Sequence, residues 1–275
     1  MANYTAADVK ALRDKSGAGM MDCKGALDEA DGDIEKAFEV LRLKGLKGVS
    51  KREGRTTTNG LVVARVAGGK GTLIELACET DFVAKAENFV ALAEEVADAV
   101  VASGASDVES ALAAPHGGSS VADAITDKAA IMGEKVELRR VAVVEASGVD
   151  AYLHRTSRDL PPQVGVLLGY EGSDSDTAHD IAVHIAAFSP QYLTRDDVPA
   201  EVVAKEREIA EATARDEGKP EAALPKIVEG RVNGFFKETC LFDQDFAKDN
   251  KQSVGKVAEA AGLKLTGFVR FRVGV

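Results

Sequence analysis

The sequence predicts an α+β protein with two related subdomains, each built on an antiparallel sheet. Within residues 61–100, and again within residues 149–188, two stretches of alternating apolar and polar residues precede a stretch with apolar residues at three- and four-residue steps. The first pattern is typical of strands with one solvated face, and the second is typical of amphipathic helices. Because the order strand, strand, turn, helix occurs twice, we expect two such subdomains packed side by side.

The composition indicates a globular chain of two or more domains, since 45% of its 275 residues are hydrophobic and 29% are charged. No run approaches the roughly 18 to 20 apolar residues of a membrane span, and the start, MANYTAAD, lacks the character of a signal peptide. We therefore expect a cytoplasmic protein without membrane contact. The net charge of −11 argues against direct nucleic-acid binding, which needs a basic surface.

Three short helices are predicted within residues 1–45. The first covers residues 5–16, with Thr5 as its N-cap and Gly17 as its stop, and the second begins at residue 21 or 22 and ends near Ala30. Asp33 caps the third, whose apolar residues follow helical spacing: Ile34, Ala37, Phe38 and Leu41. Helices of this length make a small bundle with a marginal core.

Residues 46–59 are predicted to be a basic, flexible linker. They combine Lys47, Lys51, Arg52 and Arg55 with glycines and threonines. A solvated tether is the main interpretation. The alternative is an RNA-associated scaffold that uses this segment, and its binding would collapse with added salt.

The first core subdomain is predicted to cover residues 60–145. The turn Gly68–Gly71 superficially resembles a phosphate-binding loop, but Gly71 follows Lys70 where Ser or Thr is needed, and the turn joins two strands. We therefore expect no nucleotide site here. The predicted elements are strands at 61–66, 72–80 and 136–145, helices at 89–100 and 123–132, and a loop at 103–120.

The second core subdomain is predicted to cover residues 146–275, with a projecting helical hairpin inserted at about 199–236. The hairpin helices are rich in Ala, Glu, Lys and Arg and have a thin apolar seam that includes Val202, Val203 and Ile209. The other predicted elements are strands at 149–154 and 164–170, helices at 178–188 and 253–261, and a strand at 263–273 that completes the second sheet.

No residue pattern selects catalytic or metal chemistry. His179 and His184 are five residues apart, about 140° around a helix, so they do not share a ligand face as an i, i+4 pair would. Glu79 and Asp81 are close carboxylates on an extended segment, a weak basis for acid–base catalysis. The cysteines form no Cys-x-x-Cys pair and are expected to be reduced, buried thiols. We expect no metal, no cofactor and no catalytic residue.

The corner at Thr80–Val83 lies where the strand period ends and the helical period begins. Such a corner can hold a short, rigid, exposed probe. The residues alone favour a structural role, in which Asp81 is the N-cap of the following helix and Phe82 closes the core of that helix.

The segment Glu75–Lys85, ELACETDFVAK, resembles the signature of bacterial translation elongation factor Ts. A second segment, Leu12–Lys24 followed by Ala26 and Leu27, resembles the amino-terminal signature of the same family, and the similarity covers essentially the whole chain. The chain departs from the usual pattern at three positions, none within Thr80–Val83: Ala77 replaces Asn, Ser16 replaces Thr, and Gly25 replaces a polar or basic residue.

This resemblance implies a fold and a function. The fold has a three-helix bundle like the ubiquitin-associated (UBA) domain, then two core subdomains. The function is guanine-nucleotide exchange on elongation factor Tu, in its GDP-bound and nucleotide-free forms, without enzymatic chemistry. The tip residues Thr80, Asp81, Phe82 and Val83 are expected to enter the partner and dislodge Mg²⁺.

The resemblance also implies two further contact sets. Leu12, Met20 and Met21 are expected to face the GTPase domain of the partner. A set assigned to the second subdomain, namely Ile131, Met132, Gly133 and His154, is expected to face its third domain. The alternative of another class is a small-substrate enzyme with a cleft between the two subdomains.

Overall fold

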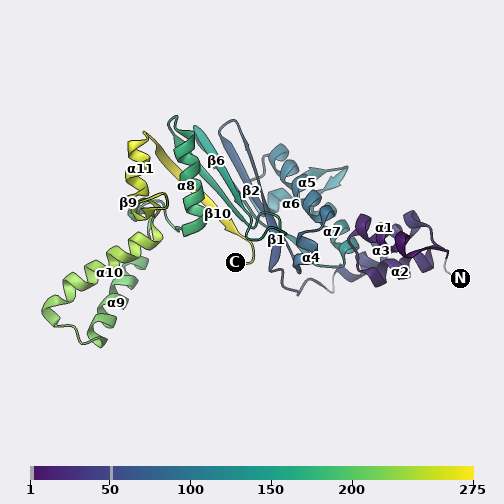
Figure 1. Ribbon diagram of the computed structural model, residues 1–275, viewed down its shortest axis with the longest axis horizontal. Coiled ribbons are helices and arrows are strands. Elements are labelled where there is room, and N and C mark those ends of the chain that lie inside the picture. The colour runs from purple at the N-terminus through teal and green to yellow at the C-terminus, as the bar shows by residue number, and fades with distance from the viewer. Residues whose placement is uncertain (1–2, 50–51) are drawn as a thin grey trace.

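The computed structural model describes residues 3–49 and 52–275, which form an elongated molecule (Figure 1). A helical bundle lies at one end, a helical hairpin projects from the other, and two sheets with their covering helices lie between them. None of the helices in the described ranges has both the length and the apolar composition needed to cross a bilayer.

The bundle consists of α1 (Ala6–Ser16), α2 (Met20–Glu29) and α3 (Ile34–Val49), which confirms the three predicted helices. Thr5 and Asp8 form a capping box, in which the Asp8 carboxylate accepts the Thr5 N–H at 2.7 Å. Gly17 ends α1 in the left-handed region. The apolar side chains that fill the bundle are Leu12, Ala18, Cys23, Ala26, Leu27, Ala30, Ala37 and Leu41.

Helix α3 extends to Val49, so the first residues of the predicted linker are helical instead. Contact with α7 (Val121–Met132) explains this, because a Cβ at Gly45 would lie only 1.8 Å from the Ala130 carbonyl oxygen. Such close packing outweighs the low helix propensity of Gly. Lys51 lies outside the described residues, and Arg52 donates to the Gly45 carbonyl at 3.4 Å.

The first sheet has the order β1-β2-β5, with β1 (Asn59–Ala67), β2 (Lys70–Cys78) and β5 (Val136–Glu145) antiparallel. Its outer face is covered by α5 (Glu87–Ser103) and α7. The expected loop at 103–120 instead holds α6 (Val108–Leu112), capped by Asp107, and a short hairpin of β3 (Pro115–His116) and β4 (Ser119–Ser120).

The second sheet has the order β10-β7-β6, with β6 (Gly148–His154), β7 (Val164–Glu171) and β10 (Lys264–Arg272). The last strand therefore completes this sheet as predicted. The outer face is covered by α8 (Ser175–Phe188) and α11 (Val254–Ala260). A small hairpin of β8 (Asp245–Phe246) and β9 (Asp249–Ser253) precedes α11.

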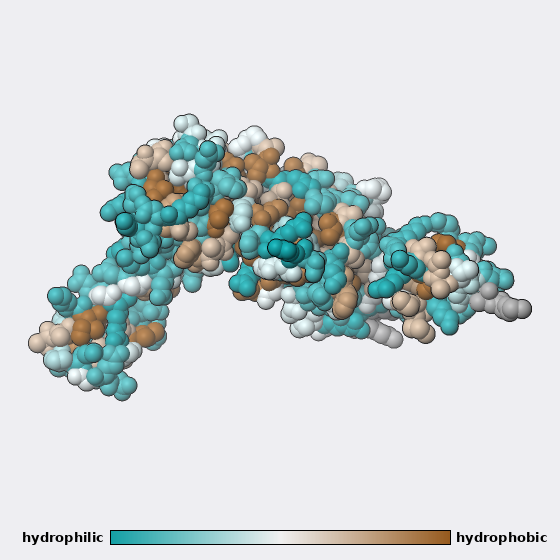
Figure 2. Space-filling view, in the orientation of Figure 1, coloured by the Kyte–Doolittle hydropathy of each residue, from teal (hydrophilic) through white to brown (hydrophobic). Residues whose placement is uncertain are grey.

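The projecting hairpin consists of α9 (Ala200–Asp216) and α10 (Leu224–Thr239) (Figure 1). Three short 3₁₀ helices flank these helices: Arg195–Asp197, Glu221–Ala223 and Leu241–Asp243. The seam is formed by Ala210, Val228 and Val232, with Val203 packed against it. Ile209 was predicted to lie in the seam, but it is 47% exposed and lies outside it. Figure 2 shows apolar groups on this arm among hydrophilic ones.

The two sheets pack against each other through their inner faces, and small residues let them approach closely. A Cβ at Gly165 of β7 would lie 2.7 Å from Leu73 Cδ1 of β2. In return, a Cβ at Gly71 of β2 would lie 3.0 Å from Leu167 Cδ2 of β7. Each leucine thus occupies space that the facing glycine leaves free, and the two predicted subdomains share this buried layer.

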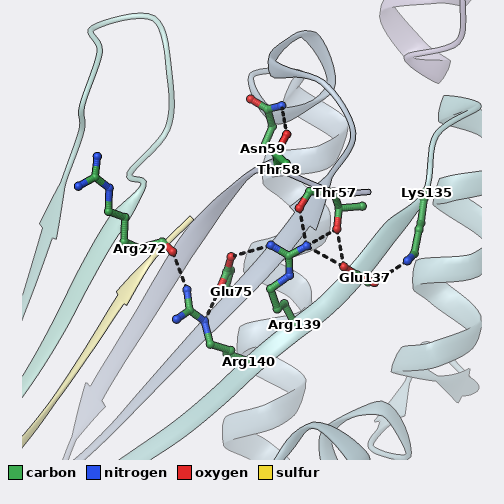
Figure 3. A network of polar contacts seen from close by, with 9 residues as sticks. All are labelled: Thr57, Thr58, Asn59, Glu75, Lys135, Glu137, Arg139, Arg140 and Arg272. Atoms are coloured by element: carbon green, nitrogen blue, oxygen red, sulfur yellow. Dashed lines mark hydrogen bonds and ion pairs between the residues drawn. The ribbon is translucent and has the colours of Figure 1, made fainter. Parts of the chain in front are cut away.

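One edge of this layer holds a polar network around the buried Glu75 (Figure 3). A bulge in the β2–β5 pairing places Arg139 between the pairs Glu75↔Arg140 and Leu76↔Leu138. Neighbouring residues of a regular strand point to opposite faces, but the bulge turns both arginines toward the fully buried Glu75. Arg140 also donates to the Arg272 carbonyl at 2.6 Å, so the network ties the first sheet to the last strand of the second.

The same network fixes the segment before β1. Thr57 is buried and bonds to both Arg139 and Glu137. Burial opposes ionisation of Glu137, but hydrogen bonds from Thr57, Arg139 and Lys135 outweigh this effect and lower its pKa to about 2. The end of the predicted linker is therefore bound to the sheet and is not a solvated tether.

We predict that Gly165→Val lowers the free energy of unfolding by about 1–3 kcal/mol, because the added methyl groups overpack the space occupied by Leu73. Chemical denaturation measures this change. The matched control is Gly267→Val in β10, where a Cβ meets nothing within 4 Å. Equal effects of the two substitutions would contradict the close sheet contact.

A second prediction concerns acid stability. His184 is buried; its Nδ1 accepts the Ala247 N–H at 3.2 Å and its Nε2 lies 2.8 Å from Gln244 Oε1. Burial lowers the pKa of His184, while the hydrogen bond to Gln244 partly opposes this shift. The unfolded chain therefore binds a proton at a higher pH than the folded chain does, and stability decreases as the pH falls below about 6.5.

Denaturation at pH 7.5 and pH 5.5 should show this loss, which is at most about 1.4 kcal/mol for one histidine. His184→Gln should reduce the difference between the two pH values. An unchanged pH dependence in His184→Gln would show that other groups cause the loss.

Candidate partner-binding site

The tip begins where β2 ends at Cys78 and the one-turn helix α4 (Asp81–Ala84) starts. Thr80 is the N-cap of α4, and its hydroxyl accepts the Val83 N–H at 3.4 Å. The structure thus corrects the expectation that Asp81 is the cap. Asp81 is the first helical residue, and its half-exposed carboxylate lies 3.4 Å from Lys85 Nζ.

Phe82 is 70% exposed, so it does not close the core of the following helix. Lys85 Nζ lies 4.5 Å from the centroid of its ring, in cation–π geometry. Val83, by contrast, is buried in the core cluster beneath α5. Two inward residues, Thr80 and Val83, therefore fix a turn whose two outward residues are a carboxylate and an aromatic ring.

The tip faces the bundle across an open hollow of about 790 Å³. Phe82 and Lys85 line it from the core, and Arg13 and Met20 line it from the bundle. Met20 is 58% exposed, and thioether side chains adapt readily to a partner surface. The structure therefore brings together Phe82 and Met20, which lie far apart in the sequence.

The bundle is held at this position by polar contacts and by the close packing of α3 on α7 at Gly45 and Ala130. The Asn88 amide of α5 donates to the Ser16 carbonyl at 2.8 Å. Arg42 of α3 pairs with Asp127 of α7 at 2.6 Å. Sequence reasoning missed Asn88, and nothing local distinguishes it from other polar helix residues.

The amino-terminal contact residues differ in their accessibility. Met21 is 75% exposed and lines a second hollow, of about 280 Å³, together with Ile131 and Gly133. Leu12 is fully buried in the bundle core. Its side chain packs among the helices, so the expected role of Leu12 in partner binding stays a prediction, and the structure offers no exposed surface of Leu12 for direct contact.

The contact set assigned to the second subdomain is split by the structure. Ile131 and Met132 are buried at the end of α7, and Gly133 caps that helix with φ of 77°. All three lie on the first sheet's side of the molecule, beside the bundle, because α7 packs on that sheet and on α3. Only His154 belongs to the second sheet, where its exposed ring bonds to the Tyr152 hydroxyl at 3.1 Å.

The basic segment contributes to the base of the tip. Arg55 lies 3.2 Å from the Glu79 carboxylate, and Lys135 donates to the Arg55 carbonyl at 3.3 Å. The ion pair between Arg55 and Glu79 engages part of the positive charge that the RNA-scaffold alternative needs.

The geometry offers little for the enzyme alternative. The inner faces of the two sheets, where its cleft would lie, are filled by apolar side chains. Burial raises the pKa of the Cys78 thiol, which disfavours the nucleophilic thiolate. Among the residues that the structure describes, no three His, Cys, Asp or Glu side chains are grouped to hold a metal ion.

Comparison with known proteins agrees with the resemblance in the sequence. The family model described as elongation factor TS matches residues 79–275. Elongation factor Ts of Micrococcus luteus is 64% identical over 277 aligned residues, which span both chains completely. The corresponding proteins of Clavibacter michiganensis subsp. michiganensis and Arthrobacter sp. strain FB24 are 64% and 60% identical, again over the whole of both chains. The chain belongs to the elongation factor Ts family.

Proposed function

We propose that the protein is a guanine-nucleotide exchange factor that binds elongation factor Tu·GDP and accelerates GDP release during the elongation step of protein synthesis in the cytoplasm. The observation that supports this most directly is the outward placement of Asp81 and Phe82 on an anchored turn beside the exposed Met20. A large exposed aromatic ring next to adaptable apolar groups suits a protein partner better than a small substrate.

The proposed mechanism is distortion by binding. The Phe82 ring enters the partner near its nucleotide site, with the Asp81 carboxylate beside it, and Thr80 and Val83 set the depth of insertion. Displacing the elements that hold Mg²⁺ leaves the negative charge of the GDP phosphates less compensated, so GDP dissociates faster. Reciprocity then requires that bound nucleotide weaken the binding of the exchange factor by the same factor.

The bundle would contact the GTPase domain of the partner through Met20 and Met21, which are both exposed. Ile131, Met132 and Gly133 would support this contact from the end of α7, and Leu12 would act only through the bundle core. His154, exposed on the second sheet, would face the third domain of the partner. No catalytic residue or cofactor takes part in this proposal.

We predict that Phe82→Ala and Asp81→Ala slow the release of fluorescent GDP from elongation factor Tu at least about tenfold, a loss of roughly 1.4 kcal/mol. Stopped-flow fluorescence measures the rate, and circular dichroism checks that each variant is folded. The matched control is Phe188→Ala, which removes another exposed ring, 53% accessible, from α8.

Fast release with folded variants would disprove the wedge mechanism but not the exchange activity. If the wild-type protein leaves GDP release unchanged, the proposed function is wrong. Turnover of a small substrate without a protein partner would then favour the enzyme alternative.

A further inference from the structure

The carboxylate of Glu134 anchors the residues that lead into the tip. Its Oε2 accepts the backbone N–H groups of Glu79 at 3.1 Å and of Thr80 at 3.0 Å. Its Oε1 accepts the hydroxyl of Thr80 at 2.5 Å. One side chain thus satisfies three donors in the two residues that lead into α4, and hydrogen bonds to a charged acceptor are stronger than neutral ones.

The contact with the hydroxyl also orients the helix cap. A hydroxyl has a single proton, and Thr80 gives it to Glu134. The lone pairs of its oxygen are then free to accept the Val83 N–H, as an N-cap must. Glu134 therefore makes Thr80, and not the neighbouring Asp81, the cap, which leaves the Asp81 carboxylate directed outward.

A reciprocal contact joins the same two segments; together with the bonds of Glu134 to Glu79 and Thr80, it forms what we call the clamp. The Glu79 carboxylate accepts the Lys135 N–H at 2.6 Å, so each of the two segments offers a carboxylate to the backbone of the other. Gly133 delivers Glu134 to this position, because its left-handed conformation ends α7 and turns the chain toward the tip. Gly133 therefore has a structural role, the placement of Glu134, in addition to any contact with a partner.

We propose that Glu134 is a positioning residue for the tip, acting through Thr80 on Asp81 and Phe82. This inference rests on the proposed exchange function, although its structural part does not. A helix of one turn is not stable in water by itself. Without the carboxylate, two backbone N–H groups and the capping hydroxyl lose their acceptor, so the turn samples other conformations and Phe82 is no longer presented in one place.

The test combines hydrogen–deuterium exchange with GDP-release kinetics on full-length Glu134→Ala and Glu134→Gln. In Glu134→Ala, the amides of residues 79–83 should exchange about tenfold faster while those of α5 stay protected. The maximal rate of GDP release should decrease about tenfold, with the half-saturating concentration within about twofold of wild type, since the bundle contacts remain. Glu134→Gln keeps the shape and an oxygen acceptor, so it should restore most of both properties.

The control variant is Glu145→Ala, which removes a glutamate from the far end of β5, where it pairs with Lys70 at 2.9 Å. It should match wild type in both measurements. Unchanged protection and unchanged kinetics in Glu134→Ala would overturn the inference, as would faster exchange throughout the core with a raised half-saturating concentration.

The two proposals fail separately. If wild type does not accelerate GDP release, the proposed function is wrong, yet faster amide exchange confined to residues 79–83 in Glu134→Ala still supports the clamp. If Phe82→Ala is inactive and Glu134→Ala behaves as wild type in both measurements, the function stands and Glu134 has no positioning role.

Discussion

The packing of the two sheets against each other is the contact on which the rest of the molecule depends. Leu73 lies over Gly165 and Leu167 lies over Gly71, so the inner faces interlock at a distance that larger residues would prevent. Each sheet then needs only one helical layer on its outer face: α5 and α7 on the first, α8 and α11 on the second. The β-bulge at Arg139 closes one edge of this layer by directing two guanidinium groups to one buried carboxylate.

The position of the tip follows from this core through a short series of contacts. β2 is the central strand of the first sheet, and its end leads directly into Thr80. α7 packs on the same sheet and ends at Gly133, which places Glu134 against the first residues of the tip. The same α7 carries the bundle through Ala130 and Asp127, so one helix aligns both sides of the hollow that contains Phe82 and Met20.

Features set by local periodicity were predictable from the sequence, and features set by distant contacts were not. The strands and helices with strong alternation or helical stripes appear where expected, including the strand that completes the second sheet. The extension of α3 depends on Gly45 meeting Ala130, which no local pattern reveals. At the tip, Thr80 and Asp81 are both good N-caps by residue type, and only the distant Glu134 decides between them. Without the family resemblance, the residues alone favour Asp81 as the cap and a buried Phe82.

The tip is fixed on its protein-facing side, while Asp81 and Phe82 face solvent. This arrangement suits insertion into a partner. Ordering a flexible turn during association would oppose binding, whereas a turn already held by Thr80, Val83 and Glu134 avoids most of that cost. On the outward side, Lys85 lies against the Phe82 ring and near the Asp81 carboxylate. A cation–π contact at an exposed site contributes only about 0.5–1 kcal/mol. A partner surface can therefore replace Lys85 at little cost, while the anchors behind the ring keep its position unchanged.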